Sequence, residues 1–165
     1  NMKIRVPPIK SYELTAKALG YMAPPIPWAE VFTALQTGIV DGAIGGGAEG
    51  YYANFRDLVK YYLAVNDHFE YWFVYMSKMV WDGLSEEDQK IVQDAFSPME
   101  AKRFDEGKAD EEANMKRLEE HGIAIITFSD EELAKMVEKA KTEVWPALRK
   151  DIGEEAFDEI VASVE

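Results

Sequence analysis

The sequence predicts an α/β domain with a largely parallel sheet. Strand and helix patterns alternate in a βαβαβ order over residues 3–44, which is typical of parallel α/β folds. Residues 69–76 form an almost continuous apolar run, the pattern of a strand that is buried on both faces. The length of 165 residues fits one domain, and 47% apolar and 30% charged residues are ordinary for a globular chain.

The first elements alternate between extended and helical patterns. In order, the sequence predicts a strand at 3–6, a helix at 11–19, an extended proline-rich segment at 23–27, a helix at 28–38 and a strand at 39–44. Ser11 is placed to cap the first helix and Gly20 to end it. One face of the second helix is apolar and comprises Trp28, Val31, Phe32 and Leu35.

Helical patterns dominate the second half. Ser85 and Asp88 form a capping-box signature, and the helix that follows places Ile91, Val92, Ala95 and Phe96 inward. Pro98 is predicted to kink or break this helix, after which a charged helix runs over 100–120. The later elements are a strand at 123–126, a helix opened by a second capping box at 129–132, and a last amphipathic helix around 157–164. The helix after 132 is predicted to bury Leu133, Met136, Val137, Ala140, Val144 and Leu148.

The charge of the chain limits its partners. With 31 acidic and 18 basic residues, the net charge is -13, which repels nucleic-acid phosphates and anionic lipids and excludes both as partners. An anionic ligand therefore needs a local cation. Because the chain has no cysteine, disulfides, thiol nucleophiles and thiolate metal sites are excluded.

No motif predicts catalysis or a cofactor. Residues 45–50 match G-x-G-x-x-G after a predicted strand, but residues 51–57 look too short and irregular for the helix of a nucleotide site. His68 and His121 lack partners at metal-ligand spacing and lack a nearby serine, and Gly-x-Ser-x-Gly is absent. We therefore expect no catalytic residue, no metal and no cofactor, and a protein that is not an enzyme.

Arg5 is the best candidate for holding an anion. It stands at the end of the first predicted strand, just before a proline turn. Ligands of α/β sheets bind outside the carboxyl ends of the strands, and a guanidinium there offers a carboxylate two charge-assisted hydrogen bonds. Position alone leaves an ordinary surface arginine as an equal alternative.

Two stretches, Lys3-Ile-Arg-Val-Pro7 and Ile26-Pro-Trp-Ala-Glu-Val-Phe-Thr-Ala-Leu-Gln-Thr-Gly-Ile-Val-Asp-Gly42, resemble the solute-binding proteins of TRAP (tripartite ATP-independent periplasmic) transporters of the DctP type. Looser likeness at 60–62, 66–68 and 81–85 extends the resemblance over nearly the whole chain. It implies a periplasmic-binding-protein-like (type II-like) fold, in which two α/β lobes close over a ligand. Residues 1–70 and 111–165 would then form the second lobe, while residues 71–110 would cross to a first lobe.

The resemblance also implies a ligand site. Arg5 falls on the family's arginine that pairs with the substrate carboxylate, and Trp28 on an aromatic position that packs against the ligand. Ile44, Gly45 and Gly46 follow the Asp-Gly turn, and Gly45 falls where many members carry an asparagine or another large polar or aromatic residue. Since this sequence offers no polar side chain there, we expect a larger or more apolar carboxylate than a short dicarboxylate.

The function that the resemblance implies is transport. The chain would be part of an extracytoplasmic, periplasmic binding protein that delivers a small organic acid to the membrane subunits of a sodium-coupled TRAP permease. The alternatives are a ligand-sensing domain of the same fold that feeds a receptor, and an enzyme of unrecognised type. No signal peptide is present, and the opening residues read as a strand already under way, so we expect a fragment whose export signal lies upstream. Such a fragment is expected to self-associate through residues 70–110.

Overall fold

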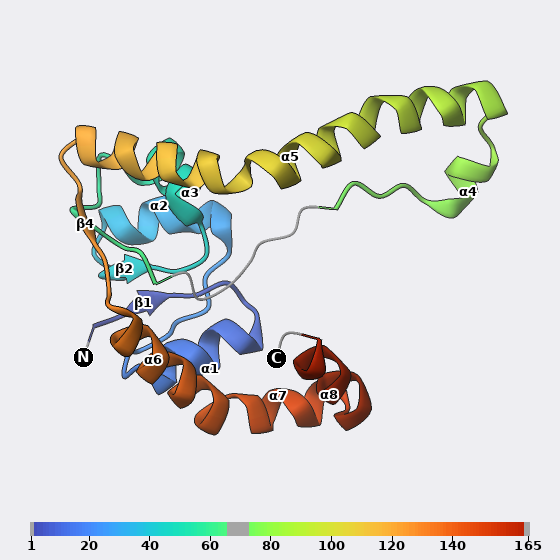
Figure 1. Ribbon diagram of the computed structural model, residues 1–165. Coiled ribbons are helices and arrows are strands. Elements are labelled where there is room, and N and C mark those ends of the chain that lie inside the picture. The colour runs from blue at the N-terminus through green and yellow to red at the C-terminus, as the bar shows by residue number, and fades with distance from the viewer. Residues whose placement is uncertain (1, 66–72, 164–165) are drawn as a thin grey trace.

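The computed structural model describes residues 2–65 and 73–163 of the chain (Figure 1). The first half contains β1 (Ile4–Arg5), α1 (Lys10–Ala18), α2 (Trp28–Gln36), β2 (Gly42–Ala43), α3 (Gly47–Phe55) and β3 (Tyr61–Leu63). The second half contains α4 (Lys78–Asp82), α5 (Glu86–Glu120), β4 (Ala124–Ile126), α6 (Asp130–Glu143), α7 (Trp145–Ile152) and α8 (Glu154–Ala162). Mixed α/β structure is confirmed, although helices predominate.

The strand pairing is parallel, as predicted. In one pair, β1 lies beside β2 with Ile4 opposite Gly42; in the other, β3 lies beside β4 with Tyr61 opposite Ala124. Single bridges from Lys3 to Met22 and from Val6 to Pro25 extend the first pair on its other side. The strand predicted at 39–44 is shorter than expected, since only Gly42–Ala43 are in strand conformation.

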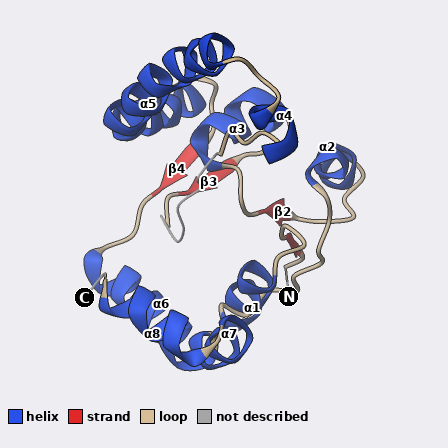
Figure 2. Cartoon of the chain, turned by 90° about the vertical axis from the view of Figure 1, so that its right-hand side faces the viewer, coloured by secondary structure: helices blue, strands red, loops and turns tan. Residues whose placement is uncertain are grey.

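Helices lie on both sides of these strands. Figure 2 shows α3 and α5 on one side and α1, α6, α7 and α8 on the other. This arrangement leaves the carboxyl ends of the short strands between two helical layers. Ligands in parallel α/β folds bind at such strand ends.

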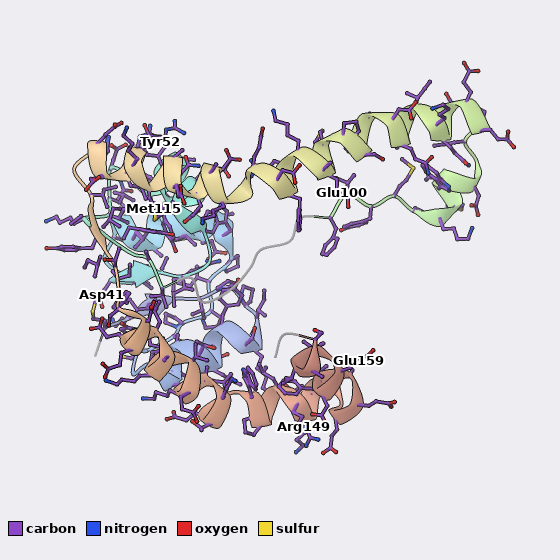
Figure 3. The ribbon with its side chains drawn as sticks, viewed as in Figure 1. Asp41, Tyr52, Glu100, Met115, Arg149 and Glu159 are labelled. Atoms are coloured by element: carbon purple, nitrogen blue, oxygen red, sulfur yellow. The ribbon has the colours of Figure 1, made fainter. Side chains whose placement is uncertain are left out.

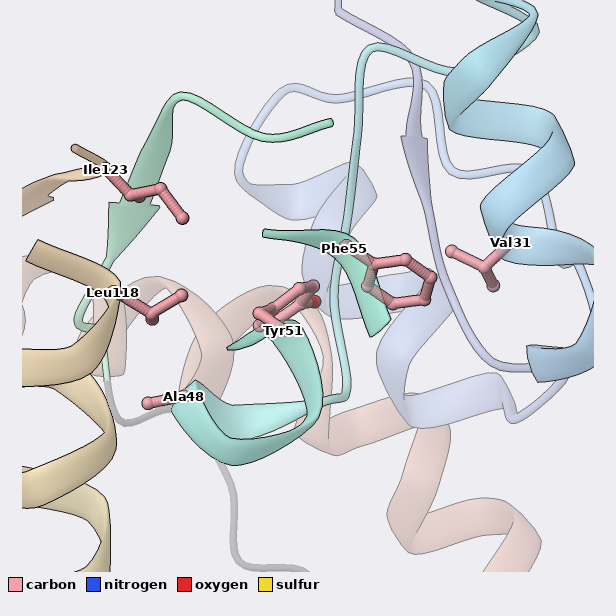
Figure 4. Packing of buried hydrophobic residues seen from close by; sticks show 6 residues of the cluster. All are labelled: Val31, Ala48, Tyr51, Phe55, Leu118 and Ile123. Carbon is pink, nitrogen blue, oxygen red and sulfur yellow. The ribbon is translucent and has the colours of Figure 1, made fainter. Parts of the chain in front are cut away.

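The main core joins α2, α3, α5 and the residue before β4. Its buried members are Val31, Ala48, Tyr51, Phe55, Leu118 and Ile123 (Figure 4). The buried face of α2 differs from the predicted one: Ala34 is buried beside Val31, whereas Phe32 is exposed. A second cluster, made of Val6, Ala16 and Ala23, packs α1 against β1.

Two helix starts differ from the prediction. Helix α1 begins at Lys10, with Ile9 at its N-cap position, so Ser11 lies within the helix and does not cap it. Residues 47–55 form helix α3, where the sequence suggested an irregular segment. The carboxylate of Glu111 on α5 accepts hydrogen bonds from the Ala48 amide at 3.2 and 3.3 Å, so a distant residue satisfies this helix start.

The second capping box is confirmed at the start of α6. The Ser129 hydroxyl accepts a hydrogen bond from the Glu132 amide, and the Glu132 carboxylate accepts one from the Ser129 amide. The single helix predicted after this box is divided at Val144, where α6 ends and α7 begins with Pro146 in its first turn. Val144 is buried as predicted, but Val137 is exposed.

Residues 73–104, which we call the arm, project from the rest of the molecule (Figure 1). The arm consists of residues 73–76, α4 and the first half of α5. Of the kink or break predicted at Pro98, the break is wrong, because α5 continues through it from Glu86 to Glu120. Ser85 caps α5 by accepting from the Asp88 amide at 3.1 Å, while the Asp88 carboxylate accepts from the Ser85 hydroxyl instead of a backbone amide.

The prediction of a buried strand at 69–76 is wrong for its described part. Residues 73–76 belong to no helix or strand and are exposed, while residues 69–72 lie outside the described ranges, as does His68. The predicted inward face of the next helix is also wrong, since Ile91, Ala95 and Phe96 are exposed. An apolar pattern indicates which residues favour burial, but it does not indicate whether a neighbouring strand is present to cover them. Within residues 2–65 and 73–163, no strand pairs with 73–76.

Candidate ligand-binding site

Arg5 occupies the last position of β1 and is buried, with 2% of its surface exposed. Its Nε donates to the carbonyl of Ile26 at 2.7 Å, and its Nη1 donates to the carbonyl of Ile44 at 2.9 Å. Both carbonyls belong to segments that run beside β1, so the fold fixes the plane of the guanidinium. This environment excludes the simple alternative of a solvated surface arginine.

Ile44 contributes to the site through its backbone. Its amide donates to the Arg5 carbonyl at 2.9 Å, and its own carbonyl accepts from the Arg5 side chain. The Ile44 side chain packs against the second core cluster. Arg5 and Ile44, both predicted as site residues, are therefore joined by these two hydrogen bonds, which connect the end of β1 to the residue after β2.

Gly45 and Gly46 lie where larger side chains do not fit. Gly45 has φ of 94°, a left-handed conformation that favours glycine, and a Cβ atom there would lie 3.0 Å from Cγ of Pro7. A Cβ atom at Gly46 would lie 2.8 Å from Cη2 of Trp28 and 3.3 Å from Cε2 of Tyr51. The missing side chain at Gly46 thus leaves no empty space, because the Trp28 ring lies against the glycine backbone.

Trp28 joins the arginine to the main core. The Cζ atom of Arg5 lies 5.5 Å from the centroid of the Trp28 ring, within the range of a cation–π interaction. The ring also makes an edge-on contact with Phe55, at 5.1 Å between centroids. Because Phe55 is fixed in the main core (Figure 4), the indole is held firmly although it is 39% exposed.

The structure brings all five predicted residues together and adds Tyr12 and Ile26. A Cβ atom at Gly45 would lie 3.4 Å from Cε1 of Tyr12, on α1. Ile26 supplies a carbonyl from a proline-rich segment, where few backbone donors compete for it. The prolines on both sides of Ile26 were the signal in the sequence that its carbonyl lacks competing donors. No spacing pattern in the sequence indicates Tyr12.

The G-x-G-x-x-G segment is not arranged to hold a phosphate. The Glu111 carboxylate already lies at the N-terminus of α3, where it accepts from the Ala48 amide and, at 2.9 Å, from the hydroxyl of Tyr62. A bound phosphate would have to displace this negative charge. A carboxylate from the chain itself therefore occupies the position at which a nucleotide fold binds its anion.

Other parts of the described chain offer weaker candidates. Surface hollows of about 400 and 480 Å³ lie between α5 and β4 and between α7 and α8, away from Arg5. His121 ends α5 and contacts Asp57 at 3.0 Å, an ion-pair position at a helix C-terminus. Among residues 2–65 and 73–163, no group of three acidic or histidine side chains is arranged to bind a metal ion. In the same residues, no helix combines the length and apolarity needed to cross a bilayer.

Comparison with known protein families shows what this chain is similar to. The family model described as "DctP: Bacterial extracellular solute-binding protein, family 7" matches residues 1–151. The chain is 36% identical over 95 residues to the solute-binding protein RD1_1052 of Roseobacter denitrificans, a match that covers 57% of this chain and 29% of that protein. It is 29% identical to the ectoine-binding periplasmic protein TeaA of Halomonas elongata, over 99% of this chain and 49% of TeaA.

A solved structure gives the same result for the fold. The sugar acid binding protein DctPAm from Advenella mimigardefordensis, in complex with galactonate, superposes with a TM-score of 0.83 and 27% identity. This superposition covers 98% of the present chain and 52% of DctPAm. The matches to TeaA and DctPAm thus span about half the length of those two relatives.

Proposed function

Since the chain belongs to the DctP family of TRAP solute-binding proteins, we propose that it binds a small organic carboxylate and delivers it to a sodium-coupled TRAP permease in the membrane. The observation that carries this proposal is the buried guanidinium of Arg5, fixed by two carbonyls at the carboxyl end of β1 and bordered by Trp28. A guanidinium with a fixed plane favours a carboxylate, because two parallel hydrogen bonds need both oxygens aligned.

The neighbours of Arg5 favour one class of carboxylate. Trp28 and the backbones of Gly45 and Gly46 form a wall without a side-chain hydrogen-bond donor apart from the indole N–H. A short dicarboxylate would need a second cation for its second charge. We therefore expect a monocarboxylate with a larger or more apolar body; the galactonate bound by DctPAm is an example of a larger monocarboxylate.

The proposal assigns separate roles to parts of the chain. Residues 1–70 and 111–165 form one lobe with the buried Arg5 at the carboxyl end of β1, and residues 71–110 cross to a first lobe that provides the opposite wall. Ligand binding then stabilises a closed state, because only closure brings both walls into contact with the ligand. The periplasmic location of TeaA supports the same location for this chain.

Calorimetry on a two-lobed protein that contains this chain tests the proposal. The ligands are galactonate, a longer aliphatic monocarboxylate, succinate and malate. We expect a monocarboxylate to bind best, and Arg5→Ala to weaken its binding by about 2–5 kcal/mol, as when one partner of a buried charge pair is removed. Arg5→Lys should also bind poorly, because an ammonium cannot donate the two parallel hydrogen bonds that a guanidinium donates to a carboxylate.

Arg56→Ala is the matched control, because Arg56 lies at the end of α3 and stacks on Tyr52, outside the proposed site. Its affinity should equal that of the wild type. Unchanged binding in Arg5→Ala would refute the site, and a preference for succinate or malate would refute the class of ligand. If none of the four acids binds, the carboxylate proposal is wrong.

A further inference from the structure

Two arginines meet at one tyrosine where the end of α3 lies beside the second half of α5. The Cζ atom of Arg117, on α5, lies 4.1 Å from the centroid of the Tyr52 ring. The Cζ atom of Arg56, at the end of α3, lies 5.2 Å from the same centroid. Both distances are within the range of cation–π contacts. We call Tyr52, Arg56 and Arg117 the arginine cluster.

Each guanidinium of the arginine cluster is held through its Nη1 atom. Nη1 of Arg56 donates to the carbonyls of Tyr52 at 3.0 Å and Ala53 at 3.3 Å, near the C-terminal end of α3. Nη1 of Arg117 donates to the side-chain oxygen of Asn114 at 3.1 Å, and Asn114 is buried. Among residues 2–65 and 73–163, the Nε and Nη2 atoms of the two arginines have no hydrogen-bond acceptor. Each fixed guanidinium therefore keeps one edge for a further acceptor.

This free edge is the one that pairs with a carboxylate elsewhere in the molecule. On α7, Nε and Nη2 of Arg149 donate to the two carboxylate oxygens of Asp158 at 2.9 and 2.7 Å. Arg56 and Arg117 form no ion pair in the part of the chain that the structure describes, although the sequence has 31 acidic residues. The carboxylate next to Arg56 in sequence, that of Asp57, contacts His121 instead. Two arginines without a carboxylate in so acidic a chain indicate that the acceptor comes from another molecule.

The surroundings of the arginine cluster favour an acidic partner. Residues 52–60 and 113–121 carry the cluster and contain four basic and three acidic side chains, against 18 and 31 in the whole chain. With a net charge of -13, the chain repels an acidic partner over most of its surface. Complementary charge at one position therefore directs such a partner to that position.

The arginine cluster lies away from the arm. Figure 3 shows Tyr52 beside the second half of α5, whereas Glu100 lies out on the arm. Arg117 is about 20 Å along α5 from Phe104, the last residue of the arm, at about 1.5 Å per residue. The first lobe of the proposed function meets the chain through residues 71–110. The proposed position of that lobe is therefore at the other end of α5.

We propose that the arginine cluster is a docking surface for an acidic segment of another protein, in which two neighbouring carboxylates each pair with one guanidinium. Arginine and tyrosine are enriched among the residues that contribute most to protein–protein binding. The contacts with Tyr52 and the Nη1 hydrogen bonds fix both guanidiniums before the partner binds, which favours two parallel hydrogen bonds to each carboxylate. Small ligands usually bind in pockets that enclose them, whereas Arg117 is exposed. The proposal does not depend on the ligand or on Arg5.

An NMR titration of the two-lobed protein that contains this chain tests the proposal. The probe is a peptide of six glutamates with blocked ends, and a peptide of six glutamines is its neutral control. We expect only the glutamate peptide to shift the side-chain Nε–H signals of Arg56 and Arg117. The double variant Arg56→Gln with Arg117→Gln should weaken binding of the glutamate peptide at least ten-fold. Lys135→Gln with Lys139→Gln removes the same charge from exposed positions on α6 and should bind the peptide like the wild type.

Arg56→Lys with Arg117→Lys separates paired hydrogen bonds from general attraction, because it keeps the charge and loses the two parallel donors. It should bind the glutamate peptide as weakly as the glutamine double variant does. Full binding by this lysine variant would refute the proposal, and so would an equal loss in Lys135→Gln with Lys139→Gln. Free glutamate or phosphate that binds as tightly as the peptide would show a site for small anions instead. A wild-type dimer that Arg56→Gln with Arg117→Gln abolishes would identify a second copy as the partner and would also refute it.

Discussion

The two halves of α5 differ in their surroundings more than in their local helix signals. The second half packs on α3, with Leu118 and Asn114 buried, whereas no residue of the first half is buried. Figure 3 shows Glu100 out on the arm and Met115 where the helix reaches the rest of the molecule. One continuous helix therefore passes from an exposed environment into a core.

The two halves are also stabilised differently. The first has a Ser85 cap, three acidic residues in its first turn and an i,i+4 ion pair between Lys90 and Asp94. The second has the packing of Leu118 in the main core and the carboxylate contact of Glu111 to α3. Local signals are sufficient to form a helix, but tertiary contacts decide whether that helix contributes to global stability.

The largest expected effect tests this difference. Leu118→Ala should lower the free energy of unfolding by about 2–5 kcal/mol, because it opens a cavity at a fully buried position. Phe104→Ala, on the same helix but in the arm, should change it by less than about 0.5 kcal/mol, because Phe104 is 85% exposed. Urea denaturation followed by circular dichroism measures both values.

Similar losses in the two variants would show that the arm and the main core unfold as one unit. That result would contradict the separation of the two halves of α5. The control for each variant is its m-value, the slope of the unfolding free energy against urea concentration, which should stay unchanged if only stability changes.

The sequence predicted local features of the fold better than long-range ones. The cap at Ser85 and the capping box at Ser129 follow from patterns within a few residues, and both are present. Parallel pairing followed from the alternating order of strands and helices and is also present. Helix α3 was missed because its N-terminus is satisfied by Glu111, 63 residues away from Ala48. The break at Pro98 was wrong because α5 tolerates one missing amide within an otherwise continuous helix.

The same limit applies to the candidate site. Arg5 and Trp28 were predicted as site residues from their motifs, and the structure places Cζ of Arg5 5.5 Å from the centroid of the Trp28 ring. The sequence does not reveal that the ring of Trp28 lies against the backbone of Gly46. Contacts between residues some 20 positions apart depend on the path of the chain, which periodicity does not reveal.

An intermediate effect is expected at the link between the arm helix and the site. Glu111→Ala removes the acceptor of the buried Ala48 amide and of the Tyr62 hydroxyl. Leaving such groups unsatisfied should cost about 1–3 kcal/mol of unfolding free energy. Hydrogen exchange at the amide of Ala48 should accelerate as well, because α3 loses the acceptor at its first turn.

Glu111→Gln separates charge from geometry, since its amide oxygen can still accept one of the two hydrogen bonds. It should lose less than Glu111→Ala. Glu112→Ala is the matched control: Glu112 is exposed and adjacent on α5, and its removal should stay within about 0.5 kcal/mol. Equal losses in Glu111→Ala and Glu112→Ala would mean that the contact with Ala48 contributes nothing.

The smallest expected effect compares the serine caps of the two regions, Ser85 on the arm and Ser129 at the start of α6. Ser129→Ala should lower global stability by about 1 kcal/mol, whereas Ser85→Ala should only speed amide exchange in the first turn of α5. The hydrogen bond from the Ser129 amide, then that from its hydroxyl, lowers the pKa of Glu132. Because the folded state favours the ionised carboxylate, this contribution is present above the ordinary glutamate pKa and is lost as the pH falls through the lowered one. The stability difference between wild type and Glu132→Gln should therefore shrink from about pH 7 to about pH 3 in thermal unfolding. A difference that is constant over this range would show that the capping box of α6 acts without its charge.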